Sequence, residues 1–136
     1  MIWDLWSQDK TSTPFLGLVG QWISVNGSNW KLECKVLGFH KISGAHDSQN
    51  LGKYFIKLTD CVGITSKSLH KLGYVTCDNA TNNDTAAAKV SSIFQCRGVH
   101  EWNNIESKLG CLAHIINLGI GNLMDKITKM AVIKTQ

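Results

Sequence analysis

The spacing of the hydrophobic residues changes near Gly44, and that change limits the folds that the chain can adopt. Before Gly44 the apolar residues fall in strand-like runs, and one run alternates strictly with polar residues. After Gly44 they recur every three or four residues, as in amphipathic helices. A chain of 136 residues with 43% hydrophobic residues can bury the core of one domain with two packed layers. We therefore expect residues 1–136 to form a single domain.

Three strand-like segments come before Gly44. Residues 1–5 are a short apolar segment, 15–23 are rich in strand formers, and 30–36 alternate between apolar and polar residues. The dipeptide Asn26-Gly27 between the last two segments indicates a hairpin, because both residues tolerate a positive φ. We expect the third strand to be half-buried, with one apolar face formed by Trp30, Leu32, Cys34 and Val36.

Helices and short strands alternate in the second half. Helical spacing predicts a helix over 47–62, with Asp47 or Ser48 as its N-cap and Gly63 as its stop. The predicted elements after it are a strand over 72–77, a helix over 85–95, a polar region over 97–107 that contains Trp102, and a helix over 111–130. The order β-β-β-α-β-α-(β)-α predicts an α/β fold with helices against a mixed sheet.

Two aspartates lie at or near the ends of predicted strands. Asp4 is on the first strand, and Asp78 follows the fourth directly. If these two strands are neighbours, the carboxylates come together, where they repel each other unless a cation lies between them. Mg²⁺ and Mn²⁺ prefer such carboxylate oxygens, and they support phosphodiester chemistry. The alternative is that both aspartates are ordinary cap or turn residues.

Cysteine and histidine spacing gives a weaker signal. The five cysteines are widely spread and odd in number, as expected for reduced, buried thiols. Cys111 and His114 lie one helical turn apart, but a zinc site needs about four ligands. We therefore favour an orienting or packing role for this pair over zinc binding.

The net charge of +4 is concentrated in the middle of the chain, where seven lysines and three acids lie between residues 31 and 71. Lys31, Lys35 and Lys41 are the candidates for contact with a polyanion such as nucleic acid. The alternative is an ordinary solvated lysine face. No apolar run reaches the roughly 20 residues that cross a bilayer, and no signal peptide is evident, so we expect an intracellular protein without a membrane partner.

Several short segments run in a family order along nearly the whole chain. They are Asp4-Leu5-Trp6-Ser7, Phe15-Leu16-Gly17-Leu18-Val19 with Trp22-Ile23, Trp30-Lys31-Leu32, Val36-Leu37-Gly38-Phe39, Gly44-Ala45-His46 through Asn50-Leu51, Thr76-Cys77-Asp78-Asn79-Ala80-Thr81-Asn82-Asn83-Asp84, and Cys111-Leu112-Ala113-His114-Ile115-Ile116-Asn117-Leu118. Through these segments the chain resembles the hAT-type transposases, whose catalytic core has a ribonuclease H-like fold.

The resemblance implies roles for individual residues. Asp4 looks like the first acid of the family's triad and Asp78 like the second, so that both would hold Mg²⁺ or Mn²⁺. Cys111 and His114 look like the family's Cys-x-x-His element, which lies close to the active centre. His46 lies in a similar Gly-x-His segment. The resemblance also implies a nuclear protein that acts on DNA and associates with itself or with a full-length transposase.

The third acid of the family, a glutamate far downstream, has no counterpart in this chain. Glu33 lies in the middle of a predicted strand, and Glu101 and Glu106 lie in a polar loop. We therefore expect a partial ribonuclease H-like core, truncated before the last acidic helix and inactive alone. One alternative is an enzyme that borrows its third acid or needs only two. The other is a non-enzymatic module that binds nucleic acid or protein.

Overall fold

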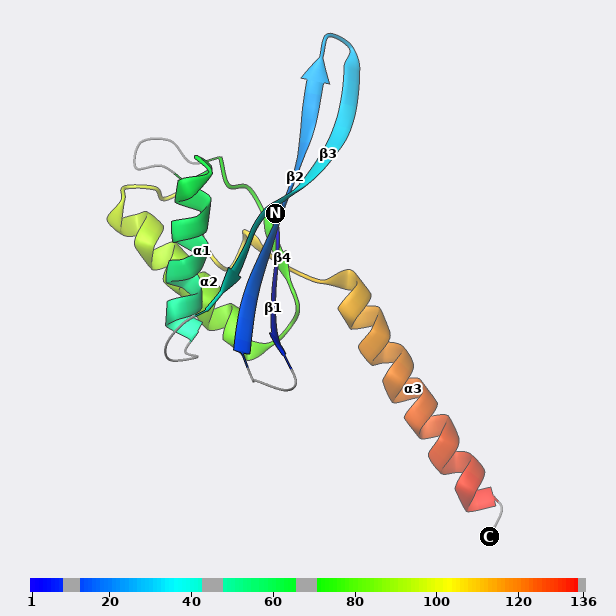
Figure 1. Cartoon of the computed structure of the whole chain (residues 1–136). Helices are drawn as coiled ribbons and strands as arrows, with labels where there is room; N and C mark the ends of the chain where they lie inside the picture. The colour runs from blue at the N-terminus through cyan, green and yellow to red at the C-terminus, as the bar shows by residue number, and fades with distance from the viewer. Residues whose placement is uncertain (9–12, 43–47, 66–70, 135–136) are drawn as a thin grey trace.

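A computed structural model of the chain describes residues 1–8, 13–42, 48–65 and 71–134. The predicted order of strands and helices is confirmed. The elements are β1 (Ile2–Gln8), β2 (Thr13–Asn26), β3 (Asn29–Lys41), α1 (Ser48–Cys61), β4 (Val75–Cys77), α2 (Thr81–Cys96), β5 (Lys108–Gly110) and α3 (Leu112–Lys134). In Figure 1, α1 and α2 lie together beside the sheet, while α3 points away from it.

The five strands form one mixed sheet in the order β3-β2-β1-β4-β5. Strand β1 is antiparallel to β2, and it is parallel to β4 through the pair Ile2 and Thr76. Strand β4 is in turn parallel to β5. The first strand of the chain is therefore the middle strand of the sheet, and the predicted α/β fold class is confirmed.

The hydrophobic core lies between one face of this sheet and helices α1 and α2. Trp3 of β1 packs edge-on against Phe55 of α1, with ring centroids 4.8 Å apart. The two helices approach closely at Gly52, where a Cβ atom would lie 2.8 Å from the carbonyl oxygen of Ala86. A residue with a side chain at this position would force the helices apart.

Trp102, the large ring in the polar region, is a core residue. It is 2% exposed and packs edge-on against Phe94 of α2. Its indole N–H donates to the carbonyl oxygen of Gly73 at 2.7 Å. The loop before β5 thus contributes to the core and is anchored to the segment that leads into β4.

Several element boundaries differ from the prediction. Strand β1 continues to Gln8, because it pairs with β2 as far as Thr13. Strand β4 has only three residues, and 72–74 precede it without strand pairing. Helix α2 begins at Thr81, four residues before the predicted start at position 85. Helix α1 agrees with the prediction, and Gly63 after it has a φ of 72°. Asp47 lies outside the described residues.

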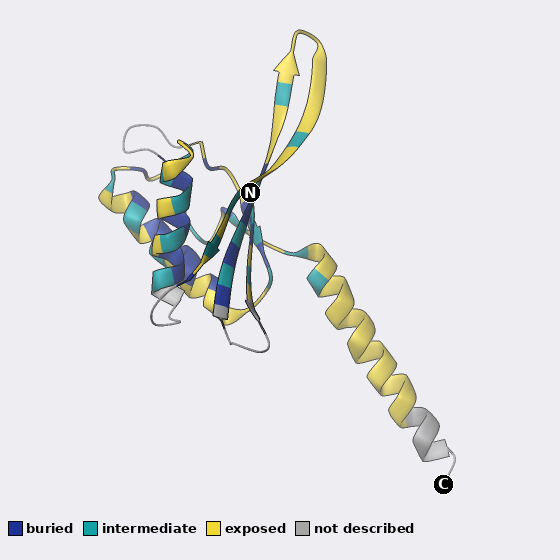
Figure 2. Ribbon diagram, in the orientation of Figure 1, coloured by how far each residue is buried: buried dark blue, intermediate teal, exposed yellow. Residues whose placement is uncertain are grey.

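Strands β2 and β3 extend beyond the rest of the sheet as a two-stranded ribbon (Figure 1). The last β2 residue that pairs with β1 is Val19, so 20–26 pair with β3 alone. The hairpin prediction is confirmed, with Asn26 paired to Asn29 and Gly27 at a φ of 59°. The predicted half-burial of the third strand is wrong (Figure 2): its four apolar residues are exposed, because the ribbon extends beyond the helices. These residues are Trp30, Leu32, Cys34 and Val36.

Helix α3 confirms the prediction of a helix over 111–130 and continues to Lys134. Its described apolar side chains are exposed (Figure 2). They include Leu112, Ile116, Ile120, Leu123, Met124 and Ile127. Among the described helices, none is long and apolar enough to span a bilayer.

A two-pronged ion pair joins the C-terminal ends of the two packed helices. The Arg97 guanidinium donates from Nη1 and Nη2 to the two carboxylate oxygens of Asp60, at 2.8 and 2.7 Å. Arg97 also donates to the carbonyl oxygen of Thr65, and the Thr65 hydroxyl donates to Asp60. These bonds, with Arg97 first, lower the pKa of Asp60.

We expect Asp60→Asn to lower the free energy of unfolding by about 1–2 kcal/mol at neutral pH, because half-exposed charge-assisted bonds contribute about that much. Because the folded-state pKa of Asp60 is lowered, this contribution is complete above its ordinary value of 3.8 and is lost as the pH falls through the lowered pKa. Urea denaturation at several pH values measures it, with the exposed Asp125→Asn as control. A difference between variant and wild type that stays constant down to acid pH would contradict the assignment.

Candidate functional site

Asp4 lies in β1, and Asp78 directly follows the neighbouring strand β4, in the middle of the sheet. The parallel register pairs Ile2 with Thr76, so Asp4 comes two residues after one paired residue and Asp78 comes two residues after the other, just beyond the end of β4. Trp3 and Cys77, one residue before each aspartate, are each 1% exposed on the helix-covered side. Side chains alternate along a strand, so Asp4 lies on the other side of the sheet, which we call the open face. Asp4 is exposed and Asp78 is partly buried.

The carboxylate of Asp78 is turned toward the start of α2. Its Oδ1 accepts a 3.1 Å hydrogen bond from the backbone N–H of Ala80, and it also accepts one from the side-chain amide of Asn83. These bonds satisfy donors around the first turn of α2, which is the usual role of an aspartate before a helix. Through Oδ1, Asp78 therefore has the role of a turn residue directly before α2, and the alternative interpretation of Asp78 as a cap or turn residue holds for this oxygen in the sense of a turn residue.

Asn83 connects the two central strands and was not anticipated from the sequence. It is 4% exposed, donates to Asp78 through Nδ2, and accepts a 3.1 Å hydrogen bond from Trp3 Nε1 through Oδ1. The buried indole N–H of β1 is thereby satisfied by the same side chain that holds the carboxylate after β4. The only sequence signal for this role is the position of Asn83 within a run of asparagines and threonines.

Asp4 lines a shallow hollow of about 260 Å³ on the open face. Its partner in β2 is Gly17, and the ring of Trp6 lies 3.0 Å from the place where a Gly17 Cβ would be. Trp6 in turn lies against Phe39, with ring centroids 5.0 Å apart. Asp78 does not contribute to this hollow, so the open face presents Asp4 beside aromatic rings.

The available carboxylates meet only part of what a divalent cation such as Mg²⁺ needs from oxygen ligands. Among the described residues, no three His, Cys, Asp or Glu side chains lie close enough together to hold a metal ion. Mg²⁺ accepts sites with one or two carboxylates that keep several waters, and Asp4 and Asp78 on adjacent strands match that donor set. These two carboxylates alone do not fill the coordination sphere of such an ion.

Lys108 of β5 brings a positive charge to the same end of the sheet. Its Nζ lies 2.7 Å from Asp84 Oδ1, and the Lys108 side chain is only 15% exposed. The hydrogen bond to Asp84, followed by smaller effects that include the charge of Asp78, raises the pKa of Lys108. Burial raises the pKa of the neighbouring Cys77 thiol, so this thiol is neutral.

The predicted Cys-x-x-His element begins next to this site. The backbone N–H of Cys111 donates to the carbonyl oxygen of Cys77 at 2.8 Å, directly before Asp78. Cys111 and His114 are partly buried at the start of α3. His46, the third residue expected near the site, lies outside the described residues.

The three candidate lysines do not form one patch. Lys31 and Lys35 share one side of the ribbon with Trp22, Ser24 and Glu33, and we call this side the lysine face. Lys31 pairs with Glu33 at 2.9 Å, and Lys35 lies 5.9 Å from the centre of the Trp22 ring. Lys41 pairs with Phe15 at the other end of β3, across the bulge that shifts the register between Leu18 and Val19.

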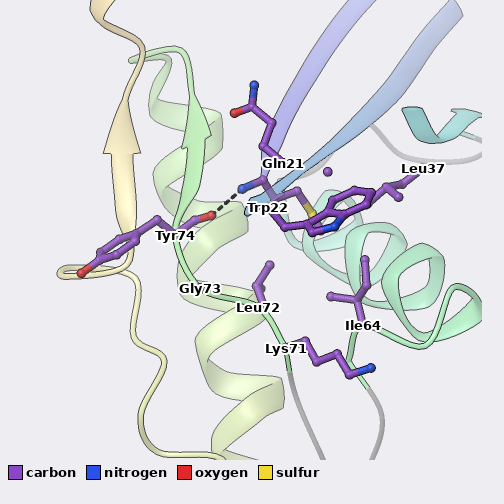
Figure 3. A pocket seen from close by; sticks show the side chains of 10 residues that line it. Gln21, Trp22, Leu37, Ile64, Lys71, Leu72, Gly73 and Tyr74 are labelled. Atoms are coloured by element: carbon purple, nitrogen blue, oxygen red, sulfur yellow. Dashed lines mark hydrogen bonds between the residues drawn. The ribbon is translucent and has the colours of Figure 1, made fainter. Parts of the chain in front are cut away.

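A second cavity, of about 510 Å³, lies away from the aspartates, at the N-terminal ends of β1 and β4 (Figure 3). Trp22, Leu37 and Ile64 line it together with residues 71–74. The Met1 amino group donates to the carbonyl oxygen of Tyr74 at 2.7 Å beside it. In parallel sheets ligands bind at the C-terminal ends of strands, so this cavity is not the expected place for the chemistry of Asp78.

Residues 2–104 match the family described as the ZBED1 RNase-like domain. The chain belongs to this family. The family is derived from hAT transposases, so the match supports the resemblance noted in the sequence without indicating a particular transposase. A comparison with curated proteins gives no match.

The region assigned to the ZBED1 RNase-like family contains both aspartates and the ribbon. The mixed sheet with helices against it is consistent with an RNase-like fold. The matched residues end at position 104, so β5, Cys111, His114 and α3 lie beyond them.

We expect Asn83→Ala to lower the free energy of unfolding by about 1–3 kcal/mol, because it leaves the buried N–H of Trp3 without its acceptor. Chemical denaturation measures the loss, and Asn117→Ala on the exposed surface of α3 is the control. A loss no larger than that of the control would show that Asn83 does not hold the two strands together.

Proposed function

We propose that this ZBED1 RNase-like domain is a transposase-derived core that retains a two-carboxylate site for Mg²⁺ or Mn²⁺ and does not cut DNA on its own. The observation that supports the proposal is the parallel pairing of β1 with β4, because Asp4 in β1 and Asp78 directly after β4 each come two residues after a residue of the pair Ile2 and Thr76. Hydration water would complete the coordination sphere of such an ion, as is common for Mg²⁺.

The residues around the pair would each have a limited role. Asp4 would offer both carboxylate oxygens from the open face, and Asp78 would offer the oxygen that does not bond to Ala80. Asn83 would fix the orientation of the Asp78 carboxylate, and Lys108 would reduce the local excess of negative charge. When bound, a divalent ion would supply positive charge next to a phosphate oxygen.

The absence of a third acid beside the pair supports the inactive form of the proposal. Phosphodiester cleavage in such sites relies on two ions that stabilise the attacking and leaving oxygens. Two carboxylates are few ligands for two ions, and one oxygen of Asp78 already accepts hydrogen bonds from Ala80 and Asn83. No further carboxylate joins them among the described residues. The alternatives are cleavage with two acids, or with a third acid from another chain.

Metal binding tests the proposal. We expect the chain to bind Mn²⁺ weakly, as followed by electron paramagnetic resonance of free Mn²⁺. Asp4→Asn and Asp78→Asn should each weaken that binding by about tenfold or more, because each removes one of two charged ligands. Asp125→Asn, at an exposed acid on α3, is the control and should have little effect.

Plasmid nicking in Mn²⁺ tests whether the two-carboxylate site only binds metal or also cleaves DNA. We expect no nicking above that of the Asp78→Ala variant. Nicking that disappears in this variant would contradict the inactive form and favour the two-acid enzyme. Mn²⁺ binding that survives both asparagine variants would contradict the site itself.

A second candidate function, DNA binding, is favoured by the lysine face. A two-stranded β-ribbon fits the major groove of DNA, and Lys31 and Lys35 lie on one side of this ribbon. The ring of Trp22 lies 5.9 Å from Lys35 Nζ and adds an aromatic surface. Contacts of this kind involve phosphates and carry little sequence information.

We expect the chain to shift duplex DNA in gels with an affinity that falls as salt rises, because lysine contacts release counterions. Lys31→Ala/Lys35→Ala should reduce both the affinity and its salt dependence, by about one to two units of slope. Lys126→Ala/Lys129→Ala on α3 has the same change in charge and serves as control. Equal losses in the two double variants would indicate net charge alone and contradict a role for the ribbon.

A further inference from the structure

The side of the ribbon opposite the lysine face has a different chemistry. The register places Val25 opposite Trp30, Ile23 opposite Leu32, Gln21 opposite Cys34 and Val19 opposite Val36. Paired residues of an antiparallel ladder share one side, and alternate pairs share the same side. These eight residues therefore form one uncharged surface, which we call the apolar ribbon face.

The residues of the apolar ribbon face are largely exposed, and Figure 2 shows most of the β2–β3 ribbon as exposed. Its larger side chains are exposed by 57% (Ile23), 60% (Val25), 73% (Trp30), 68% (Leu32) and 75% (Val36). With side-chain areas of roughly 200 Å² each, they present about 650 Å² to solvent, close to the roughly 800 Å² that one partner contributes to a standard interface. A contiguous apolar patch of this size marks an interaction surface.

The ribbon also needs a covering layer for its own stability. A two-stranded hairpin is at best marginally stable in water, and three strands or a packed layer are usually required. Residues 20–26 have no β1 neighbour, and both sides of the ribbon are largely exposed in the described structure. Burial of the apolar ribbon face would therefore stabilise the strands as well as the contact.

We propose that the apolar ribbon face is the contact surface of a homodimer, in which the ribbons of two copies stack face to face. The face has no charged residue, so two identical copies can meet around a twofold axis without like-charge repulsion. Two β-layers pack in this manner about 10 Å apart. The two lysine faces then point outward, away from the contact.

Edge-to-edge pairing and DNA fit this surface less well. Strand β3 is an edge of the sheet, but Lys31, Lys35 and Lys41 along it and the bulge opposite Leu18 and Val19 are features that oppose edge pairing. DNA requires positive charge, which the apolar ribbon face lacks. The exposed stripe of α3 is another apolar surface that could join two copies, so the test must separate it from the ribbon.

The oligomeric state of single-residue variants tests the proposal. Sedimentation of the full chain should give twice the mass of one copy. Leu32→Asp places a carboxylate inside the contact and should halve this mass at the same concentration. Ser24→Asp, on the lysine face of the same ribbon, and Leu123→Asp, on α3, should leave it unchanged. Thermal unfolding checks that the core of each variant is intact.

Cysteine cross-linking gives a second readout that does not depend on disrupting the contact. Cys34 lies on the apolar ribbon face, whereas Cys61 and Cys96 are exposed near the ends of α1 and α2. With Cys61, Cys96 and Cys111 changed to Ser, a short bis-maleimide should join two chains through Cys34. A chain that keeps Cys96 in place of Cys34 is the matched control and should remain single.

The results that overturn the proposal are distinct. A monomeric wild-type chain at concentrations used for structural work overturns it. Dissociation by Leu123→Asp with no effect of Leu32→Asp assigns the contact to α3 instead. Equal cross-linking through Cys34 and Cys96 indicates random collision. Each result is independent of metal binding, so it does not bear on the two-carboxylate site.

Discussion

The parallel pairing of β1 with β4 is the contact on which the other features depend. It makes the first strand of the chain the centre of the sheet and aligns Asp4 with Asp78. The pairing is reinforced on the helix-covered side, where Trp3 packs against Phe55 and donates to Asn83. Since Asn83 also holds Asp78, the same side chain that secures the core fixes the orientation of a candidate ligand.

Local sequence signals predicted the elements well, because each depends on a few neighbouring residues. Asn26-Gly27 predicted the hairpin turn, and the change of period after Gly44 predicted where helices begin. The start of α2 was missed because the three asparagines and one threonine over 79–83 resemble a loop, although residues 81–83 belong to the helix. Intrinsic helix propensity predicts a helix start poorly where tertiary contacts, here those of Asn83, stabilise the first turn.

Burial could not be predicted in the same way. Alternation in the third strand correctly indicates an apolar face, but it does not say whether another layer covers that face. Trp102 shows the reverse case, since a polar local sequence surrounds a ring that is buried against Phe94. For the site, the sequence identified both aspartates. The bonds that turn Asp78 toward α2 depend on Asn83 and on the backbone at Ala80, and no pattern indicates them.

The two sides of the sheet thus differ in the side chains that they present. The helix-covered side holds the core and the links through Trp3, while the open face presents Asp4, Trp6 and Phe39. Because positions alternate regularly from Phe15 to Val25 along β2, the apolar ribbon face continues the open face beyond the helices. A second copy on the ribbon would therefore lie on the same side of the sheet as Asp4.

The order of the strands also has a consequence for how the chain folds. The β2–β3 ribbon is made of local contacts and can form within microseconds, whereas β1 meets β4 only after residues 2 and 76 come together. Early in folding, the chain would therefore form this ribbon only transiently, with its apolar side exposed, because a lone hairpin is marginally stable in water. Such species aggregate at high concentration. Refolding from denaturant at low protein concentration should therefore recover more folded protein than refolding at high protein concentration.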